Sequence, residues 1–403
     1  MSRQTSRHAR PAAVALLLAL AAAYGCRDAQ PPAPPVAANS LVPLGVHPGT
    51  VHPTEENLPR RSELAASISI SGDSRGGGAA ERFARRLARA RQVGAFGAVE
   101  GTPDQVFGNI EDIAAGEDGR LYVLDSRYNN VRIFDASGRP LASFGGPGGG
   151  PAEFRAPEAL SRDRQGRILV ADRHNRIKLF APQGASYAVQ GSISVRFVPE
   201  DFCLLGDAVF VQGIERDAFL HAFSASGQRL RSFGAPYATA NWLVREQLSD
   251  GPVACSEEAG TVVTMLKYLP VVYGYSPQGE LRWVSRLEDF RPIRITEEVN
   301  AKGKPRVSFE GDAPYDIAES LQTAPGGLVV VQTARRTPQS NRDKLEFAEL
   351  RTYVLSAATG QGVYVGNHLP RIGAVTGTRV LAGENDPYPR VRILEMPGAE
   401  AGR

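Results

Sequence analysis

The chain has 403 residues, of which 42% are apolar, with 42 glycines and 29 prolines, so it can bury a large core and is rich in turns. This composition excludes fibrous and wholly disordered classes. Three of the 46 basic residues precede Cys26 and no acidic residue does, so 43 basic and 43 acidic residues follow it. That balance excludes a general nucleic-acid-binding role, which needs a basic surface.

The first 26 residues have the layout of an export signal. Arg3, Arg7 and Arg10 precede the apolar run 12–23, and small residues lead to Cys26. This arrangement resembles a bacterial lipoprotein signal, which implies that Cys26 is diacylated, becomes the new N-terminus and holds the protein on a membrane. Ordinary cleavage with secretion is the alternative. A retained transmembrane helix is disfavoured, because about 15 apolar residues fall short of the ~20 that cross a bilayer.

The residue after this cysteine bears on localisation. Arg27 stands where the resembling sorting signal has Asp for retention in the inner membrane. The resemblance therefore favours the periplasmic side of the outer membrane, in a bacterial cell envelope.

Residues 27–90 are expected to be a tether and a lead-in to the fold. Eight prolines lie between Pro31 and Pro59 among small and polar residues, which is typical of an extended spacer. Residues 79–92 have an amphipathic helical pattern with Phe83 and Leu87 on one face. Its arginines could touch anionic lipid, but a solvated helix or irregular lead-in is the favoured interpretation.

One sequence pattern occurs twice between residues 107 and 195. The period is about 46 residues, which suits a four-stranded propeller blade. The matching pairs are Phe107 with Phe154, Gly119 with Gly166, Asp125 with Asp172, and Phe134 with Phe180. The copies resemble NHL repeats, in which a blade reads as Phe, Pro, an apolar strand, a Gly turn, an apolar strand ending in Asp, an Asn and an Arg-rich strand. The second copy matches with Phe154, Pro157, Gly166, Asp172 and Asn175.

Gly-containing turns give the number of blades. Six of them join consecutive apolar runs, and these are Asp118-Gly119, Gln165-Gly166, Gly206-Asp207, Ala259-Gly260, Gly326-Gly327 and Thr376-Gly377. A second series follows the third strands but has five members, namely Ser137-Gly138, Gln183-Gly184, Ser226-Gly227, Gln278-Gly279 and Thr359-Gly360. The sixth blade therefore lacks its outermost strand.

The missing strand is expected from the N-terminal side. Residues 93–107 resemble 141–154, which form a fourth strand and the linker to the next blade. Pairing this strand with the third strand of blade six would remove two exposed sheet edges. The sequence thus predicts an all-β fold over residues 91–397, a six-bladed β-propeller of four-stranded blades closed by an N-terminal strand.

The apolar pattern differs between strands. Second strands such as 121–124 and 168–171 are continuous apolar runs, so both faces are expected to be buried. Third strands alternate, which predicts that Arg132 and Lys178 lie nearer to solvent.

One face of the propeller is expected to carry the binding residues. The Gly turns occupy one face, whereas the other carries insertions at 287–314 and about 333–349. Acidic residues at the entry to the innermost strands should converge at the mouth of the central channel, and these are Glu111, Asp112, Glu158, Glu200, Asp201 and Asp316. Arg127, Arg173 and His174 lie on the same face and complete the candidate binding residues.

The acidic group has two interpretations. Several carboxylates around one cavity would attract Ca²⁺ or a basic ligand. Alternatively, these acids cap turns, accept backbone N–H bonds and face water. Asp125 and Asp172 are expected to be turn-forming residues rather than ligands.

The resemblance also implies an enzymatic alternative. Some NHL-like and six-bladed relatives are metal-dependent lyases or hydrolases whose His and acidic ligands come from several blades. After the tether this chain has only His174, His221 and His368, and three convergent imidazoles are not expected. No H-E-x-x-H, G-x-S-x-G or Cys–His arrangement is present, so no catalytic residue is assigned.

Two cysteines follow Cys26. Cys203 and Cys255 fall at similar points of innermost strands in blades three and four. An exported protein meets an oxidising space, so they could form a disulfide, or they could be two buried thiols.

The sequence therefore predicts a lipid-anchored propeller that serves as a binding or protein-interaction module through its loop-rich face. The expected partners are the membrane and either another envelope protein or a small ligand, with calcium as the one candidate cofactor. A structural or sensory part of a larger complex is a third interpretation.

Overall fold

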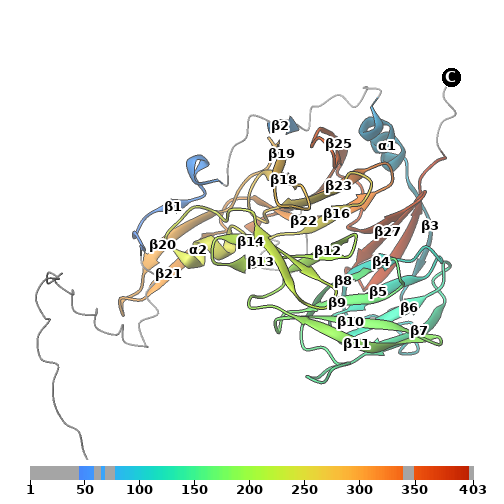
Figure 1. Cartoon of the computed structure of the whole chain (residues 1–403). Coiled ribbons are helices and arrows are strands. Elements are labelled where there is room, and N and C mark those ends of the chain that lie inside the picture. Colours follow the sequence, from blue (N-terminus) through green and yellow to red (C-terminus); the bar gives the residue numbers. More distant parts are fainter. Residues whose placement is uncertain (1–44, 59–64, 69–77, 339–348, 399–403) are drawn as a thin grey trace, which may run out of the picture. The chain divides into compact units, whose positions relative to one another are not determined.

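The computed structural model describes residues 45–58, 65–68, 78–338 and 349–398. Most of this part consists of six sheets, each built on four antiparallel strands (Figure 1). In five of them the four strands are consecutive in the chain, and the sixth combines the last three strands with β3 (Arg91–Phe96). Sheets one to three contain β4 (Ile110–Ala115), β5 (Leu121–Asp125), β6 (Asn130–Phe134) and β7 (Pro140–Gly145); β8 (Pro157–Arg162), β9 (Ile168–Asp172), β10 (Arg176–Gln183) and β11 (Ser186–Ser194); and β12 (Asp201–Leu205), β13 (Ala208–Glu215), β14 (Ala218–Ser224) and β15 (Arg229–Phe233).

Sheets four to six follow the same order. They contain β16 (Val253–Ser256), β17 (Thr261–Met265), β18 (Val271–Tyr275) and β19 (Leu281–Leu287); β22 (Tyr315–Ala324), β23 (Leu328–Arg336), β24 (Glu349–Ser356) and β25 (Gly362–Gly366); and β26 (Ile372–Thr376), β27 (Arg379–Glu384) and β28 (Arg390–Glu395). All eleven predicted Gly turns lie between consecutive strands of these sheets.

The first strands of the six sheets form a closed ring. Each contacts the first strand of the next sheet, in the order β4, β8, β12, β16, β22, β26 and back to β4. The remaining strands of each sheet extend outward from this axis. The predicted all-β, six-bladed propeller is therefore confirmed.

The sixth sheet takes its outer strand from the N-terminal side of the fold. β3 (Arg91–Phe96) pairs antiparallel with β28, with Phe96 opposite Val391 and Arg91 opposite Glu395. The backbone groups of β28 that would otherwise face water are thus hydrogen-bonded.

The second strands are buried on both faces as predicted, since every residue of β5, β9 and β17 is buried. Close packing against both neighbouring blades explains this.

The expectation for the third strands is wrong, because Arg132 and Lys178 are buried. Arg132 lies 3.1 Å from Asp125 and over the Phe107 ring. Lys178 lies 3.9 Å from Asp172 in the same blade position of the next sheet. Both cations donate to backbone carbonyls of the preceding linker. The repeated Asp and cation thus connect each blade to its linker, and a buried charge needs such partners.

Asp125 and Asp172 accept hydrogen bonds from backbone N–H groups of the loops around them. Gly108 and Asn109 donate to Asp125 at 2.8 and 3.1 Å, and Arg155 and Ala156 donate to Asp172 at 3.2 and 3.3 Å. They are turn residues, as expected.

The predicted tether docks on the propeller over part of its length. β1 (Val51–His52) pairs with β20 (Arg294–Val299), and η1 (Glu55–Asn57) brings Glu55 to Arg286, 2.6 Å away. β2 (Ala65–Ile68) adds a fifth, parallel strand to sheet four beside β19. The extended spacer is therefore wrong for residues 51–57, while residues 27–44 lie outside the described residues.

A buried polar network explains the docking of β1. His52 lies 2.7 Å from the Glu297 carboxylate and 2.9 Å from the Tyr237 hydroxyl. The Thr54 N–H also donates to this hydroxyl, at 2.8 Å. All polar atoms named are partnered, so the segment can be buried at low cost.

Helix α1 (Ala79–Ala88) is packed, not solvated. Phe83 and Leu87 share the apolar face that the pattern predicts, and both are buried against sheets five and six. The favoured expectation of a solvated helix is wrong, because this face covers apolar side chains of β24 and β25.

Two further elements lie on the loop-rich side. The insertion forms a hairpin of β20 and β21 (Pro305–Glu310), and the linker from blade three to four contains α2 (Trp242–Gln247), capped by the Asn241 side chain. Sequence reading found the insertion but not its structure. The second predicted insertion falls largely on 339–348, outside the described residues.

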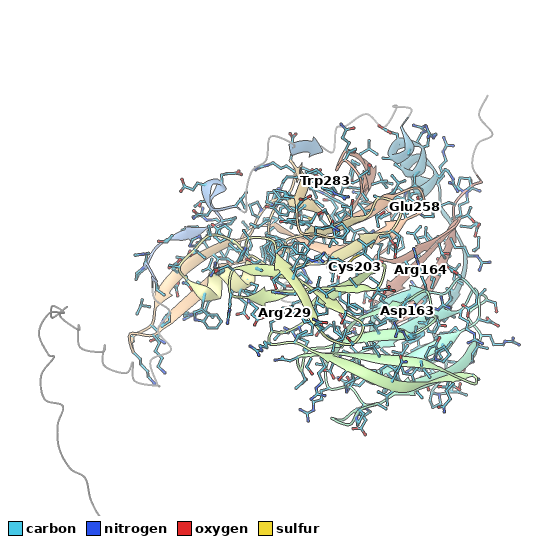
Figure 2. The ribbon with its side chains drawn as sticks, viewed as in Figure 1. Asp163, Arg164, Cys203, Arg229, Glu258 and Trp283 are labelled. Carbon is cyan, nitrogen blue, oxygen red and sulfur yellow. A yellow bond between two sulfur atoms is a disulfide. The ribbon has the colours of Figure 1, made fainter. Side chains whose placement is uncertain are left out.

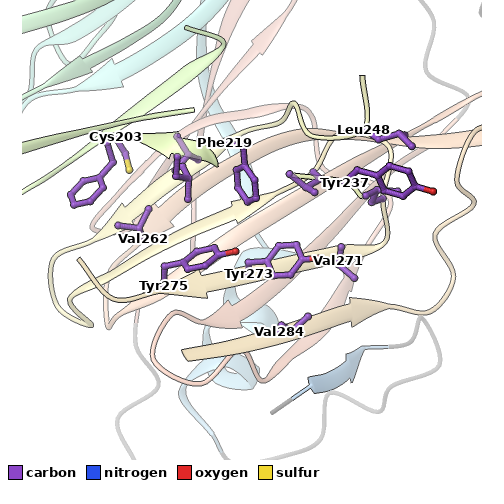
Figure 3. Packing of buried hydrophobic residues seen from close by; sticks show 14 of the residues in the cluster. Cys203, Phe219, Tyr237, Leu248, Val262, Val271, Tyr273, Tyr275 and Val284 are labelled. Atoms are coloured by element: carbon purple, nitrogen blue, oxygen red, sulfur yellow. The ribbon is translucent and has the colours of Figure 1, made fainter. Parts of the chain in front are cut away.

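The largest apolar cluster lies where blades three and four meet this hairpin (Figure 3). Tyr237, Tyr273 and Val262 are fully or almost fully buried in it. Among the residues that the structure covers, no helix is both long and apolar enough to cross a bilayer.

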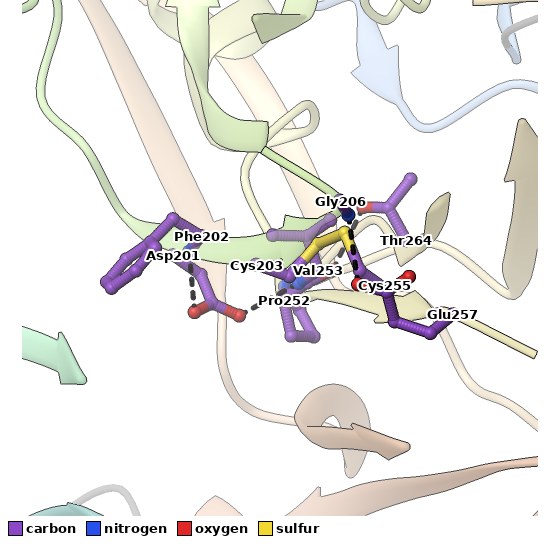
Figure 4. The surroundings of a disulfide bond; sticks show 9 residues. All are labelled: Asp201, Phe202, Cys203, Gly206, Pro252, Val253, Cys255, Glu257 and Thr264. Atoms are coloured by element: carbon purple, nitrogen blue, oxygen red, sulfur yellow. Dashed lines mark hydrogen bonds between the residues drawn. A yellow bond between two sulfur atoms is a disulfide. The ribbon is translucent and has the colours of Figure 1, made fainter. Parts of the chain in front are cut away.

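Cys203 and Cys255 form a disulfide between β12 and β16 (Figure 4), with Cα atoms 5.4 Å apart. This decides between the two interpretations that the sequence left open. The bond joins the inner strands of blades three and four.

Candidate functional site: the axial cavity

A cavity of about 870 Å³ runs along the axis, lined by residues from all six inner strands. Among the described residues its lining has ten carboxylates but five basic side chains, so its surface is acidic. Figure 2 labels Asp163 and Arg164, which belong to its Gly-turn end, where Arg164 pairs with Glu257 at 3.0 Å.

Five of the six predicted acids line this cavity, and these are Glu111, Asp112, Glu158, Glu200 and Asp201. Each lies among the first three residues of an inner strand or just before it, which is the position from which the topology directs it to the axis. The ring thus brings together residues that are 90 positions apart.

Asp316 does not belong to this group. Its side chain is 1% exposed and pairs with Arg335 through both oxygens, at 2.8 and 2.9 Å. The Arg291 N–H also donates to it, at 2.7 Å. The expectation that Asp316 faces the channel is wrong, because β22 begins earlier than the other inner strands and places this residue within the blade.

Arg173 lies at the mouth and bridges two of the acids. Its guanidinium is 3.4 Å from Glu158 and 3.2 Å from Glu200. His174 instead lies beside Asp172, half-exposed, and Arg127 is exposed outside the cavity lining. The structure therefore brings Arg173 to the acids but not the other two.

Sequence reading missed several lining residues. Lys267 lies 3.9 Å from Asp250, and Arg371 lies 3.1 Å from Glu319. Tyr268 and Tyr315 complete the mouth, with ring centroids 6.5 Å apart. Glu319 and Arg371 lie at inner-strand entries and could have been found by extending the repeat. Asp250 follows α2 in a linker without a repeat counterpart, so no signal pointed to it.

Two of the acids connect neighbouring blades. Asp112 accepts from the Leu160 N–H of blade two at 2.8 Å, and Asp201 accepts from the Val253 N–H of blade four at 2.8 Å. Both are surrounded by protein although the cavity reaches them. Burial raises the pKa of Asp112 to about 6 and that of Asp201 to about 8, from an ordinary value of 3.8.

The remaining mouth acids are also perturbed. Burial, with the charge of Asp250 added, raises the pKa of Glu200 to about 7. Burial and the charge of Glu111 raise the pKa of Glu158. The cavity therefore gains negative charge as pH rises through neutrality.

We expect the contribution of Asp112 and Asp201 to the free energy of unfolding to fall as pH rises from about 4 to about 8. Over this window the raised pKa values leave Asp112 and Asp201 more protonated in the folded chain than in the unfolded chain. Their contribution is full below about pH 4 and is lost as pH passes each folded-state value, with a slope of at most about 1.4 kcal/mol per pH unit for each carboxyl. Urea unfolding at a series of pH values measures it.

Asp201→Asn should flatten the upper part of this dependence, from about pH 6 to about pH 8. The matched control is Asp207→Asn, since Asp207 is an exposed residue of a Gly turn. Equal slopes in the two variants would contradict the assignment.

A metal site is not formed by these acids. Within residues 45–58, 65–68, 78–338 and 349–398, no group of three or more His, Cys, Asp or Glu side chains could hold a metal ion. His221 is buried in β14 with hydrogen bonds to Ser232 and Gly213, and burial lowers its pKa to about 4. His368 contacts the Ala88 carbonyl instead. The described residues therefore offer no set of metal ligands that would support the calcium interpretation or the lyase alternative.

The chemistry that remains is recognition of positive charge. Carboxylates that outnumber cations in a partly enclosed cavity attract a cationic group, and tyrosine faces at the mouth can contact its alkyl or ammonium part.

Comparisons with known proteins support the fold. A protein family described as a 6-bladed β-propeller matches residues 95–210. A protein from Bacteroides fragilis described as exported is similar in structure, with 9% identity, a TM-score of 0.51, and coverage of 83% of this chain and 100% of that one. A member of the DUF4221 family from Bacteroides vulgatus has 10% identity, a TM-score of 0.50, and coverage of 77% and 98%.

Virginiamycin B lyase from Staphylococcus aureus is also similar, with 8% identity, a TM-score of 0.43, and coverage of 72% and 95%. That likeness is too weak to bear on activity. The fold does not by itself set the function, which depends on the site that loops and strand ends build on the rigid scaffold.

Proposed function

We propose that this protein is a lipid-anchored β-propeller of the bacterial cell envelope, related to NHL-repeat proteins, that binds cationic ligands at the mouth of its axial cavity. The acidic cavity is the observation that carries the proposal. Its volume of about 870 Å³ lies within the range of small-molecule sites, so an organic amine or a Lys or Arg side chain of a partner protein would fit.

The mouth supplies the groups that such a ligand needs. Glu200 and Glu158 are held 3.2 and 3.4 Å from Arg173, and a ligand ammonium can compete for the same oxygens. Ion pairs in a partly enclosed site are stronger than those in open solvent. Tyr268 and Tyr315 contribute apolar area beside them.

Location on the membrane comes from the sequence. Cys26 follows a basic segment and an apolar run, and the described fold begins 19 residues later, at Gly45. A structurally similar protein described as exported agrees with an extracytoplasmic location. The periplasmic side of the outer membrane is the proposed site.

We expect saturable binding of spermidine, a flexible polyamine, by the full-length protein in detergent, measured by isothermal titration calorimetry. Glu200→Gln should weaken binding roughly tenfold, because a charge-assisted hydrogen bond contributes about 1.5–3 kcal/mol, of which part is lost to solvent. Binding should also be tighter near pH 8 than near pH 6, since the pKa of Glu200 is about 7.

Glu280→Gln is the matched control, because Glu280 is exposed in a Gly turn and does not line the cavity. A lysine-rich peptide in a parallel titration distinguishes a free amine from a protein side chain. The proposal would be contradicted if neither spermidine nor the peptide bound saturably. It would also be contradicted if Glu200→Gln and Glu280→Gln changed the affinity equally.

A further inference from the structure

Exposed apolar side chains concentrate at one place in the described residues. Three of the nine large apolar side chains that stand out into solvent belong to α2 and the inserted hairpin, and these are Trp242, Val299 and Phe309, with exposures of 48%, 44% and 42%. The others are spread over the outer strands β3, β7, β11 and β15 and over loops of blade one.

Two of these side chains, Val299 and Phe309, are on one face of the hairpin. In the β20–β21 register Ile295 lies opposite Phe309, and Val299 lies opposite Pro305. Directly opposed residues share a face, and residues two apart share it as well. Ile295 is fully buried in the core, so Phe309 and Val299 are the parts of the same face that extend beyond it. α2, which carries Trp242, contacts β21.

The turn of this hairpin is basic. Asn300 and Lys304 close the turn, and Lys302 and Lys304 are both exposed. Among the described residues neither lysine has an ion pair, whereas Arg306 pairs with Glu298. Apolar and aromatic groups next to unpaired lysines match the boundary between acyl chains and anionic headgroups.

The N-terminal segment joins the fold beside this surface. β1 pairs with β20, and Gly45 approaches Ala240, two residues before Trp242, so closely that an added Cβ would lie 2.3 Å from the Ala240 side chain. Eighteen residues separate Gly45 from Cys26, a reach of at most about 65 Å. An anchor on Cys26 would therefore leave this surface within reach of the membrane.

We infer that Trp242, Val299 and Phe309, with Lys302 and Lys304, form a membrane-docking surface that inserts into the headgroup region of an anionic bilayer. The inference rests on the proposed membrane location but not on the proposed ligand. A partner protein could also cover an apolar surface, but the position of the N-terminal segment and the unpaired lysines favour lipid. Docking would set the orientation of the cavity mouth relative to the membrane.

Tryptophan fluorescence tests this directly, because the chain has two tryptophans and Trp283 is buried, 2% exposed, with its N–H bonded to the Ala357 carbonyl. The full-length protein is reconstituted in phosphatidylethanolamine–phosphatidylglycerol vesicles with or without brominated acyl chains. We expect brominated lipid to quench Trp242, and Trp242→Phe to abolish the quenching.

Phe309→Lys should shift the docking equilibrium about tenfold toward the undocked state, as loss of a buried aromatic group predicts. Leu230→Lys is the matched control, since Leu230 on β15 has a similar exposure of 44%. Replacing both Lys302 and Lys304 by Glu, or omitting phosphatidylglycerol, should also reduce quenching.

Cys26→Ser separates this inference from the anchor. If that variant still shows quenching, the surface docks without an acyl anchor, and this inference holds whether or not Cys26 is lipidated in the wild type. If the anchored wild type associates with vesicles but brominated lipid leaves its emission unchanged, the docking surface is refuted and a protein partner is the remaining occupant. If the wild type neither associates with vesicles nor shows quenching, both the lipid anchor and the docking surface are refuted.

Discussion

Replacing both Cys203 and Cys255 by serine is expected to lower the free energy of unfolding by about 4 kcal/mol. The bond closes a loop with a sequence separation of 52, and the loop-entropy relation gives this value for the cross-link in the unfolded chain. Urea unfolding of the wild type and the double variant, both under non-reducing conditions, measures the difference. A change below about 1 kcal/mol would contradict the expectation.

The position of the disulfide adds to its expected effect. It joins β12 to β16 at the cavity wall, where the Val253 N–H also donates to Asp201 at 2.8 Å and the Gly206 N–H to Glu257 at 2.9 Å. These links act on the inner strand of blade four. Reduction of the wild type by a thiol is an independent route to the same loss and controls for the serine hydroxyls.

Asp316→Ala is expected to destabilise the protein by about 3–5 kcal/mol, the usual cost of removing one partner of a buried ion pair. The substitution leaves Arg335, whose side chain is 11% exposed, without its bidentate partner, and it leaves the Arg291 N–H without an acceptor. Glu349 lies 3.6 Å from Arg335 and compensates in part, which favours the lower end of the range. Thermal and urea unfolding measure the change.

Asp312→Ala is the matched control, because Asp312 lies four residues earlier and is exposed. Since Asp316 does not line the cavity, the folded fraction of the Asp316→Ala protein should bind spermidine with the wild-type affinity. An unchanged stability together with weakened binding would restore Asp316 to the group of binding residues.

The acids show how far repeat reasoning extends. Glu111 and Glu158 lie in the two blades that match each other best, and their convergence on the axis follows from strand order alone. Asp316 lies in blade five, where an insertion precedes the inner strand and shifts its start, so the same reasoning placed it wrongly. The expectation that Arg132 and Lys178 lie near solvent was wrong for a different reason. Period-two alternation marks one face of a strand, but in a propeller both faces meet another blade.

The sequence by itself determined the blade number, the eleven turns, the buried second strands and the positions from which the acids meet, because these depend on local turn chemistry and on a short-range repeat. Only the tertiary structure decided that residues 45–58 and α1 pack on the propeller, that the two inner cysteines bond, and that Asp250, Lys267 and Arg371 complete the cavity mouth. These contacts join residues from 17 to 280 positions apart, as Lys267 with Asp250 and His368 with Ala88 show. Their free energy depends on complementary burial and pairing in three dimensions, which composition and period do not encode.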